Sequence, residues 1–323
     1  MDFITELKRN VVAGHQVTRA EAVVLYDMPL NPLCSAANEL RTFFCSDLFD
    51  LCTIINVKSG TCPENCKYCA QSAFYCTGAE EYPLLDPETI VAEAKYNAKR
   101  GVLRYSIVAS GRCVSDPEMN KICEAVKRIR EETEVSVCIS LGLLNEEQFR
   151  KLKDSGVSRV HNNLETSRNF FPNICTTHSF DDKVAAITAA KNAGLSVCSG
   201  GIMGLGESPA DRIDMALSLR ELGIRSIPIN ILNPVKGTPL EGNRPLSEWD
   251  IQRIISVYRF ILPDSFIRLA GGRSLLPDQG KACFTSGANA AISGDMLTTA
   301  GINVDTDRKL LRELNFRVGL CHE

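Results

Sequence analysis

Short apolar segments alternate with longer amphipathic segments through most of the chain. The short segments carry apolar residues in runs or at every second position, which is the pattern of buried strands. This pattern predicts strands at residues 50–57, 103–110, 134–141, 158–164, 195–201, 225–232, 265–270 and 289–294.

Helical patterns fill the intervals between most of these strands. They cover residues 87–100, 119–133, 146–155, 180–193, 209–222 and 246–260. A glycine, the usual helix stop, precedes the next strand at Gly101, Gly156, Gly194 and Gly223. Eight strands separated mostly by helices predict a parallel (β/α)8 barrel, with a doubly wound sheet as the alternative.

Alternation within the strands predicts which side chains face the barrel interior. A common barrel fills its interior with Val, Ile and Leu. Here the predicted inward set is polar or carries thiols, so we expect a polar or metallic group in the lumen. The set includes Cys52, Asn56, Ser106, Ser136, Cys138, Ser140, Ser196, Cys198 and Arg268.

Length and composition agree with one barrel domain. The chain has 323 residues, 44% hydrophobic and 23% charged, and a net charge of −3. We expect a helical extension at residues 1–46 and a barrel with a C-terminal cap at 47–323. The acidic balance argues against nucleic acid or an anionic membrane as a partner. No apolar run approaches the ~20 residues of a membrane span, and the first ten residues lack a signal-peptide core, so we expect a cytoplasmic protein.

The fourteen cysteines indicate metal, cluster or redox chemistry in a chain of this size. Three of them, Cys62, Cys66 and Cys69, form a C-x3-C-x2-C loop after the first predicted strand. Three thiolates on a short loop can hold three corners of a cubane cluster, leaving one iron open to a small ligand. Lone cysteines are usually packed as small hydrophobes, and we expect this of Cys34, Cys45, Cys123, Cys175, Cys283 and Cys321.

Zinc is the main competing metal for the three-cysteine loop. A closed structural zinc site needs a fourth ligand, usually in a second C-x2-C or H-x3-H pair. No such pair occurs, and the chain has only four histidines. The sequence therefore favours an iron–sulfur cluster.

The loop, with an aromatic residue before its last cysteine, resembles the radical S-adenosylmethionine (SAM) signature. Further segments resemble the biotin synthase family, and together they extend from about Asp47 to Phe316. The segments are Cys62–Ser72, His161–Ser167, Val197–Glu207, Pro228–Leu232, Lys236–Leu240 and Ile267–Arg273.

The resemblance implies an activity and its cofactors. Biotin synthases insert sulfur between two unactivated carbons of dethiobiotin. A reduced 4Fe-4S cluster cleaves SAM to methionine and a 5′-deoxyadenosyl radical, and a second, auxiliary cluster in the barrel supplies the sulfur. The resemblance also implies a homodimer and reduced flavodoxin or ferredoxin as the electron donor.

The resemblance assigns binding roles residue by residue. Those it places at SAM are Tyr68, Asn163, Glu165, Lys183, Gly200, Ile202, Gly204, Glu207 and Asn233. Those it places at dethiobiotin are Asn163, Asn230, Thr298 and Thr299. Two positions depart from the family pattern, because Glu165 replaces a common Asp and Lys183 stands where an Arg is expected.

The auxiliary cluster of the family commonly has three barrel cysteines and one arginine as ligands. Cys138, Cys198 and Arg268 match three of these positions, but the fourth falls on Ser106, a poor iron ligand. Our hypothesis is that Cys52, on the neighbouring strand, supplies the missing thiolate; a serine-ligated cluster is the alternative. The cluster is then either the usual 2Fe-2S type or a four-iron type with an additional sulfide.

Two rival functions remain at this point. One is a related radical SAM enzyme, such as a hydrogenase-maturation or methylornithine-forming homologue. Cys138, Cys198 and Arg268 together argue against it, since those reactions need no sulfur-donating cluster there. The other is a non-catalytic iron–sulfur scaffold, which would not need the SAM-facing segments.

Overall fold

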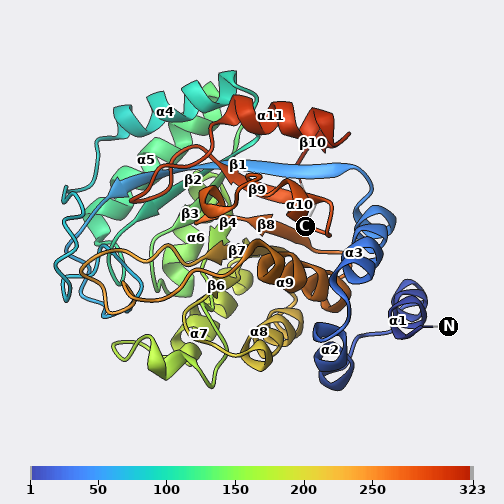
Figure 1. Cartoon of the computed structure of the whole chain (residues 1–323). Coiled ribbons are helices and arrows are strands. Elements are labelled where there is room, and N and C mark those ends of the chain that lie inside the picture. The colour runs from blue at the N-terminus through green and yellow to red at the C-terminus, as the bar shows by residue number, and fades with distance from the viewer. Residues whose placement is uncertain (1, 321–323) are drawn as a thin grey trace.

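The structure, a computed structural model, describes residues 2–320. Its sheet follows the order β10-β1-β2-β3-β4-β5-β7-β8-β9, and an additional pairing of β9 with β1 closes it into a barrel (Figure 1). Every strand pair is parallel, which confirms the (β/α)8 prediction over the doubly wound sheet. The strands are β1 (Leu48–Lys58), β2 (Arg104–Ala109), β3 (Ser136–Ser140), β4 (Val157–His161), β5 (Ser196–Cys198), β6 (Gly201–Met203), β7 (Ser226–Ile231), β8 (Phe266–Leu269), β9 (Ala290–Ser293) and β10 (Arg317–Val318).

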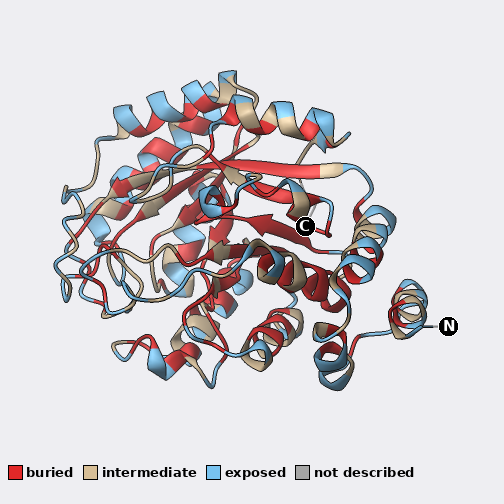
Figure 2. Ribbon diagram, in the orientation of Figure 1, coloured by how far each residue is buried: buried red, intermediate tan, exposed pale blue. Residues whose placement is uncertain are grey.

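Helices connect successive strands and cover the outside of the barrel, with their outer faces exposed and the strands buried (Figure 2). The helices are α4 (Pro87–Lys99), α5 (Asp116–Glu132), α6 (Glu146–Ser155), α7 (Phe180–Asn192), α8 (Pro209–Glu221) and α9 (Glu248–Ile261). Local sequence determines where they begin and end. The side chain of Asp86 caps the start of α4, beside Pro87, and Gly156 adopts φ 112° at the end of α6. Two short elements, η2 (Arg273–Leu275) and α10 (Lys281–Phe284), connect β8 to β9.

The fifth predicted strand is interrupted in the structure. β5 ends at Cys198, and β6 begins at Gly201 beside β7. A Cβ atom on Gly200 would lie 1.9 Å from the carbonyl oxygen of Pro228, so this position accepts only glycine. The interruption leaves the ends of β5 and β6 open toward the barrel lumen.

The two ends of the chain add layers to the barrel. α1 (Phe3–Val12), α2 (Arg19–Tyr26) and α3 (Leu30–Cys45) precede it, with α2 against α8 and α3 against α9 (Figure 1). α11 (Val304–Glu313) follows β9, and β10 extends the sheet beside β1. The division after residue 46 stays a prediction. Within residues 2–320, no helix combines the length and the apolar character that crossing a membrane requires.

A cluster of buried charged side chains surrounds Asp50, near the start of β1. The side chain of Asp50 on β1 is fully buried, and its Oδ1 lies 2.7 Å from Nη2 of Arg268. Arg104 and Arg159 approach its Oδ2 at 3.6 and 4.0 Å. One carboxylate therefore joins guanidinium groups from β2, β4 and β8.

We expect Asp50→Asn to lower the free energy of unfolding by about 3 kcal/mol, because it leaves buried guanidinium groups without their anion. Urea denaturation followed by circular dichroism measures the change. Asp47→Asn is the control: Asp47 pairs with Arg317 at the surface, at 3.4 Å, and its loss should cost less than about 1 kcal/mol. Equal effects of the two substitutions would contradict the stabilising role of Asp50.

Candidate active site

The barrel lumen contains a cavity of about 400 Å³. Side chains of the barrel strands line it, together with the loops that follow β1 and β9. Catalytic sites of such barrels lie at the carboxyl ends of the strands. The predicted site residues among the lining side chains are Cys52, Cys62, Tyr68, Cys69, Ser106, Cys138, Asn163, Glu165, Lys183, Cys198, Ile202, Asn230, Asn233, Arg268, Thr298 and Thr299.

The three-cysteine loop folds back on itself after β1. The N–H of Cys62 donates to the carbonyl of Gln71 at 3.0 Å, and the N–H of Cys69 donates to the carbonyl of Cys66 at 3.0 Å. Cys62 and Cys69 face the cavity, whereas Cys66 does not line it. Three thiols on one short, hydrogen-bonded loop fit the ligand set of a cubane cluster with an open iron.

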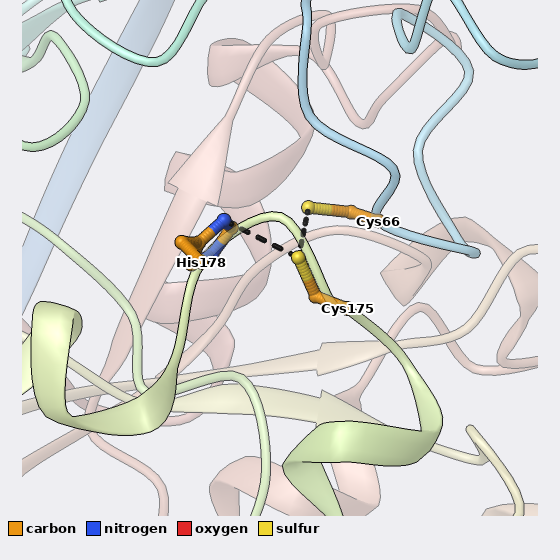
Figure 3. A group of neighbouring side chains, drawn as sticks. All are labelled: Cys66, Cys175 and His178. Atoms are coloured by element: carbon orange, nitrogen blue, oxygen red, sulfur yellow. Dashed lines mark hydrogen bonds between the residues drawn. The ribbon is translucent and has the colours of Figure 1, made fainter.

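Cys66 contacts a second cysteine, on the loop between β4 and α7. Figure 3 shows the sulfur of Cys175 between Cys66 and His178. The two sulfur atoms are 3.8 Å apart, and Sγ of Cys175 lies 3.2 Å from Nδ1 of His178. The same Nδ1 is 2.6 Å from Oε2 of Glu64, whose other oxygen accepts a hydrogen bond from Arg112 at 3.0 Å.

These contacts shift the pKa values of the groups involved. The hydrogen bond with Cys66, and then those with His178 and Thr177, lower the pKa of the Cys175 thiol to about 3 against the effect of burial. The same hydrogen bond and burial raise the pKa of Cys66. From the sequence we expect Cys175 to be packed as a small hydrophobe, and we assign no role to His178. Their C-x2-H spacing is the signal that could have indicated a pair of metal ligands.

Residues assigned to SAM cluster around the end of β4. Oδ1 of Asn163 accepts a hydrogen bond from the N–H of Gly200 at 3.1 Å, and its Nδ2 donates to Glu165 at 3.3 Å. Glu165 holds φ 70° and forms a bridge to Gly201. Burial, and then the charge of Glu165, raise the pKa of Tyr68, whose hydroxyl also hydrogen-bonds that carboxylate.

Three residues of the predicted SAM segment do not line the cavity: Gly200, Gly204 and Glu207. Gly200 allows the close approach to Pro228, and Gly204 adopts φ 102°. The Glu207 carboxylate accepts hydrogen bonds from the N–H of Gly204 at 2.9 Å and from Arg212 at 2.6 Å. In the described structure Gly200 lies in the interruption between β5 and β6, Gly204 and Glu207 shape the turn after β6, and Ile202 reaches the cavity.

The residues assigned to dethiobiotin lie on other walls of the same cavity. Nδ2 of Asn230 donates to the carbonyl of Gly201 at 3.1 Å, and its Oδ1 accepts from the N–H of Gly271 at 2.9 Å. Half of the hydrogen-bonding capacity of this amide remains for a ligand. Thr298 and Thr299 belong to the loop after β9, which Asn56 holds through the carbonyl of Leu297 at 3.1 Å.

Three thiols from separate strands share the deeper part of the lumen, Cys52 on β1, Cys138 on β3 and Cys198 on β5. Burial raises the pKa of Cys52, and it raises the pKa of Cys138 to about 11. Burial acts most strongly on Cys198 and raises its pKa, but the hydrogen bond with His161 and the charges of His161, Arg268 and Arg159 together lower that pKa to about 6. His161 is the register partner of Cys198 across β4 and β5 and lines the cavity.

Ser106 and Arg268 both lie beside these thiols. Ser106 is paired in register with Cys138 and hydrogen-bonds it. Nη1 of Arg268 lies 3.3 Å from Sγ of Cys52, while its Nη2 is held by Asp50. The inward orientation predicted for Cys52, Ser106, Cys138 and Cys198 is confirmed by their place on the cavity wall.

Comparison with known proteins identifies two family regions in the chain. The radical SAM superfamily matches residues 56–219, and the biotin and thiamin synthesis associated domain matches residues 228–317. Together they cover the barrel from β1 to β10.

Solved structures share the fold at low sequence identity. The chain superposes on methylornithine synthase with a TM-score of 0.84 at 22% identity, covering 97% of both chains. For HydG, a maturase of the [FeFe]-hydrogenase, the TM-score is 0.83 at 18% identity, covering 99% of this chain and 76% of that one. This likeness shows the fold alone.

Sequence relatives are far closer. A biotin synthase of Brachyspira hyodysenteriae is 56% identical over 98% of this chain and 95% of its own length. Biotin synthase 2 of Corynebacterium diphtheriae is 53% identical over 100% of this chain and 98% of its own length. The chain belongs to the biotin synthase family of the radical SAM superfamily.

Proposed function

We propose that this protein catalyses the insertion of sulfur into dethiobiotin to form biotin, with SAM as cosubstrate and a 4Fe-4S cluster as cofactor. The arrangement of one cavity carries the proposal: the three-cysteine loop, the SAM-assigned residues and three buried thiols all face or adjoin it. A non-catalytic scaffold would need neither a cavity of this volume nor the polar side chains around it.

Cys62, Cys66 and Cys69 are the ligands that we assign to the 4Fe-4S cluster. When bound, this cluster supplies the electron that cleaves SAM and generates the 5′-deoxyadenosyl radical. Tyr68 and Ile202 provide apolar surface for the adenosyl group, while Asn163 provides a polar contact. The barrel walls surround a bound substrate and so limit the access of water to a reactive species.

Asn230 is the residue that we assign to the ureido group of dethiobiotin. Backbone groups of β6 and of the loop after β8 fix its amide, so its free donor and acceptor positions point in a defined direction. The hydroxyl groups of Thr298 and Thr299 suit a carboxylate at the opposite end of the substrate. This pairing orients the carbon chain across the lumen.

For the auxiliary cluster, we propose that Cys52, Cys138 and Cys198 are ligands and that Ser106 is not. All four side chains reach the cavity, so ligand chemistry decides: iron prefers thiolate to a serine hydroxyl that must first lose its proton. Arg268 already donates to Asp50 and to the carbonyl of Ala291, which favours a role as a charged neighbour of Cys52. When bound, the auxiliary cluster, of 2Fe-2S type or of four-iron type with an added sulfide, supplies the sulfur.

The partners follow from the same chemistry. SAM cleavage needs electrons one at a time at low potential, and a reduced flavodoxin or ferredoxin delivers them in this way. We propose one of these as the electron donor and a homodimer as the functional assembly.

Replacing Cys62, Cys66 or Cys69 by Ala should abolish 5′-deoxyadenosine formation, because two thiolates hold a cubane poorly. Liquid chromatography of the products after reduction measures this. The triple variant should still contain iron, held by the auxiliary site. Normal SAM cleavage in any single variant would disprove the ligand assignment, and complete loss of iron from a folded triple variant would disprove the second cluster.

Asn230→Ala should weaken dethiobiotin binding by about 1–3 kcal/mol, because the ureido group loses a hydrogen-bonding partner. Binding of SAM should change much less. Equilibrium binding measured with each ligand separates the two effects, with the exposed Asn120→Ala as the control. An equal loss of both ligands would contradict the assignment of Asn230 to dethiobiotin.

Cys52→Ala should remove the auxiliary iron and stop biotin formation while SAM cleavage continues, and Ser106→Ala should do little. Iron and sulfide counts with Mössbauer spectra check both variants. Cys123→Ala, on the outer helix α5, is the matched cysteine control. If Ser106→Ala removes the cluster and Cys52→Ala leaves it intact, the serine is the ligand.

A further inference from the structure

Cys66, Cys175 and His178 form a compact group of metal-binding side chains beside the three-cysteine loop. Their donor atoms all lie within 4.8 Å of one another. Cys175 and His178 supply a C-x2-H pair on the loop between β4 and α7, and Cys66 comes from the loop after β1. A zinc site requires a second pair of ligands. The fold brings such a pair, Cys175 and His178, next to Cys66, which the spacing along the sequence did not reveal.

The distances agree with tetrahedral coordination. Two sulfur atoms bound at 2.3 Å to one zinc ion are about 3.8 Å apart, and a bound sulfur and nitrogen are about 3.6 Å apart. The sulfur atoms of Cys66 and Cys175 are 3.8 Å apart, and Sγ of Cys175 lies 3.2 Å from Nδ1 of His178. An ion between these atoms would need only a small outward shift of the imidazole.

Glu64 lies next to the fourth coordination position. Its Oε2 is 2.6 Å from Nδ1 of His178, the nitrogen that faces Cys175. Arg112 and Thr177 hold the carboxylate in place from its other sides. Glu64 is not one of the residues whose donor atoms all lie within 4.8 Å of one another, so its side chain would have to turn toward the ion to supply the fourth ligand.

The chemistry of the donors selects the kind of metal. Two thiolates, an imidazole and a carboxylate suit zinc, whereas magnesium and calcium prefer oxygen donors alone. In the structure these donor atoms are joined by hydrogen bonds, and a divalent cation would take the place of the hydrogen-bonded protons. Cys175 and His178 are only 5% and 8% exposed, while Cys66 is partly exposed and leaves a route of entry.

We propose that the protein without its 4Fe-4S cluster binds one zinc ion through Cys66, Cys175 and His178, with Glu64 at the fourth position. The site goes beyond the proposed function and depends on it at one point, because Cys66 is also the ligand that we assign to the cluster. The sulfur of Cys66 contacts Cys175, and Cys66 does not line the cavity that Cys62 and Cys69 line, so zinc bound in this position would hold Cys66 away from the cluster. The zinc site therefore competes with cluster assembly.

Zinc titration of the full-length, cluster-free protein under anaerobic, reducing conditions tests the ligand set. The variants Cys66→Ala, Cys175→Ala and His178→Ala should each lose one zinc equivalent or weaken its binding by about 100-fold. Cys62→Ala and Cys69→Ala are the matched controls in the same loop and should keep that equivalent. Zinc that remains bound in all five variants is held by other thiols. It adds the same amount to each variant and does not affect the differences between them.

The opposite pattern overturns the proposal. If Cys62→Ala and Cys69→Ala lose the zinc while Cys175→Ala and His178→Ala keep it, the three-cysteine loop alone binds the ion. X-ray absorption of the zinc-loaded wild-type protein provides a second measurement that does not require any variant to fold. Two sulfur and two nitrogen or oxygen neighbours are expected, and three or four sulfur neighbours would contradict the assignment.

Competition with the cluster is tested by reconstitution with iron and sulfide. Protein preloaded with one zinc equivalent should assemble the 4Fe-4S cluster more slowly than zinc-free protein, and the Cys175→Ala variant should lose this difference. Equal rates with and without zinc in the wild-type protein would disprove the exclusion. Zinc binding and SAM cleavage are separate readouts, so failure of one does not imply failure of the other.

Discussion

Closure of the barrel through β1 is the constraint on which the site depends. β1 pairs with β2 on one side and with β9 on the other, so Cys52 lies level with both Arg104 and Ile292. This register turns Cys52 into the lumen, and the end of the same strand leads into the three-cysteine loop. One strand therefore positions both the cluster loop and a buried thiol.

Asp50, on the same strand, forms ion pairs with side chains of other strands of the closed barrel. Its carboxylate is buried among guanidinium groups from three other strands. Buried anions such as thiolates need compensating charge. The position of Asp50 thus keeps the positively charged Arg268 beside Cys52.

The loop between β4 and α7 supplies the polar and thiol side chains on the other side of the site. It carries Cys175 and His178 to the back of the three-cysteine loop, while the end of β4 presents Asn163 and Glu165 to the cavity. Cys66 lies between these regions, with its thiol turned away from the cavity wall. The loop to which we assign the 4Fe-4S cluster is therefore in contact with a second set of side chains that could hold a metal ion.

Sequence periodicity by itself determined the barrel, because alternating strands and helices leave few other ways to bury both faces of a parallel sheet. It also determined that Cys52, Ser106, Cys138 and Cys198 face inward, since this depends only on the two-residue repeat of a strand. The spacing of Cys62, Cys66 and Cys69 identified the cluster loop for the same local reason. Resemblance to the family, not periodicity, supplied the substrate.

Tertiary structure decided the features that depend on contacts between distant segments. The pairing of Asp50 with Arg268 joins β1 to β8, and the contact of Cys66 with Cys175 joins two loops more than 100 residues apart. It also decided that Gly200 packs against Pro228, that Glu207 holds the turn after β6, and that neither residue lines the cavity. Spacing along the chain cannot reveal such contacts, because they arise only when the closed barrel brings the ends of its strands together.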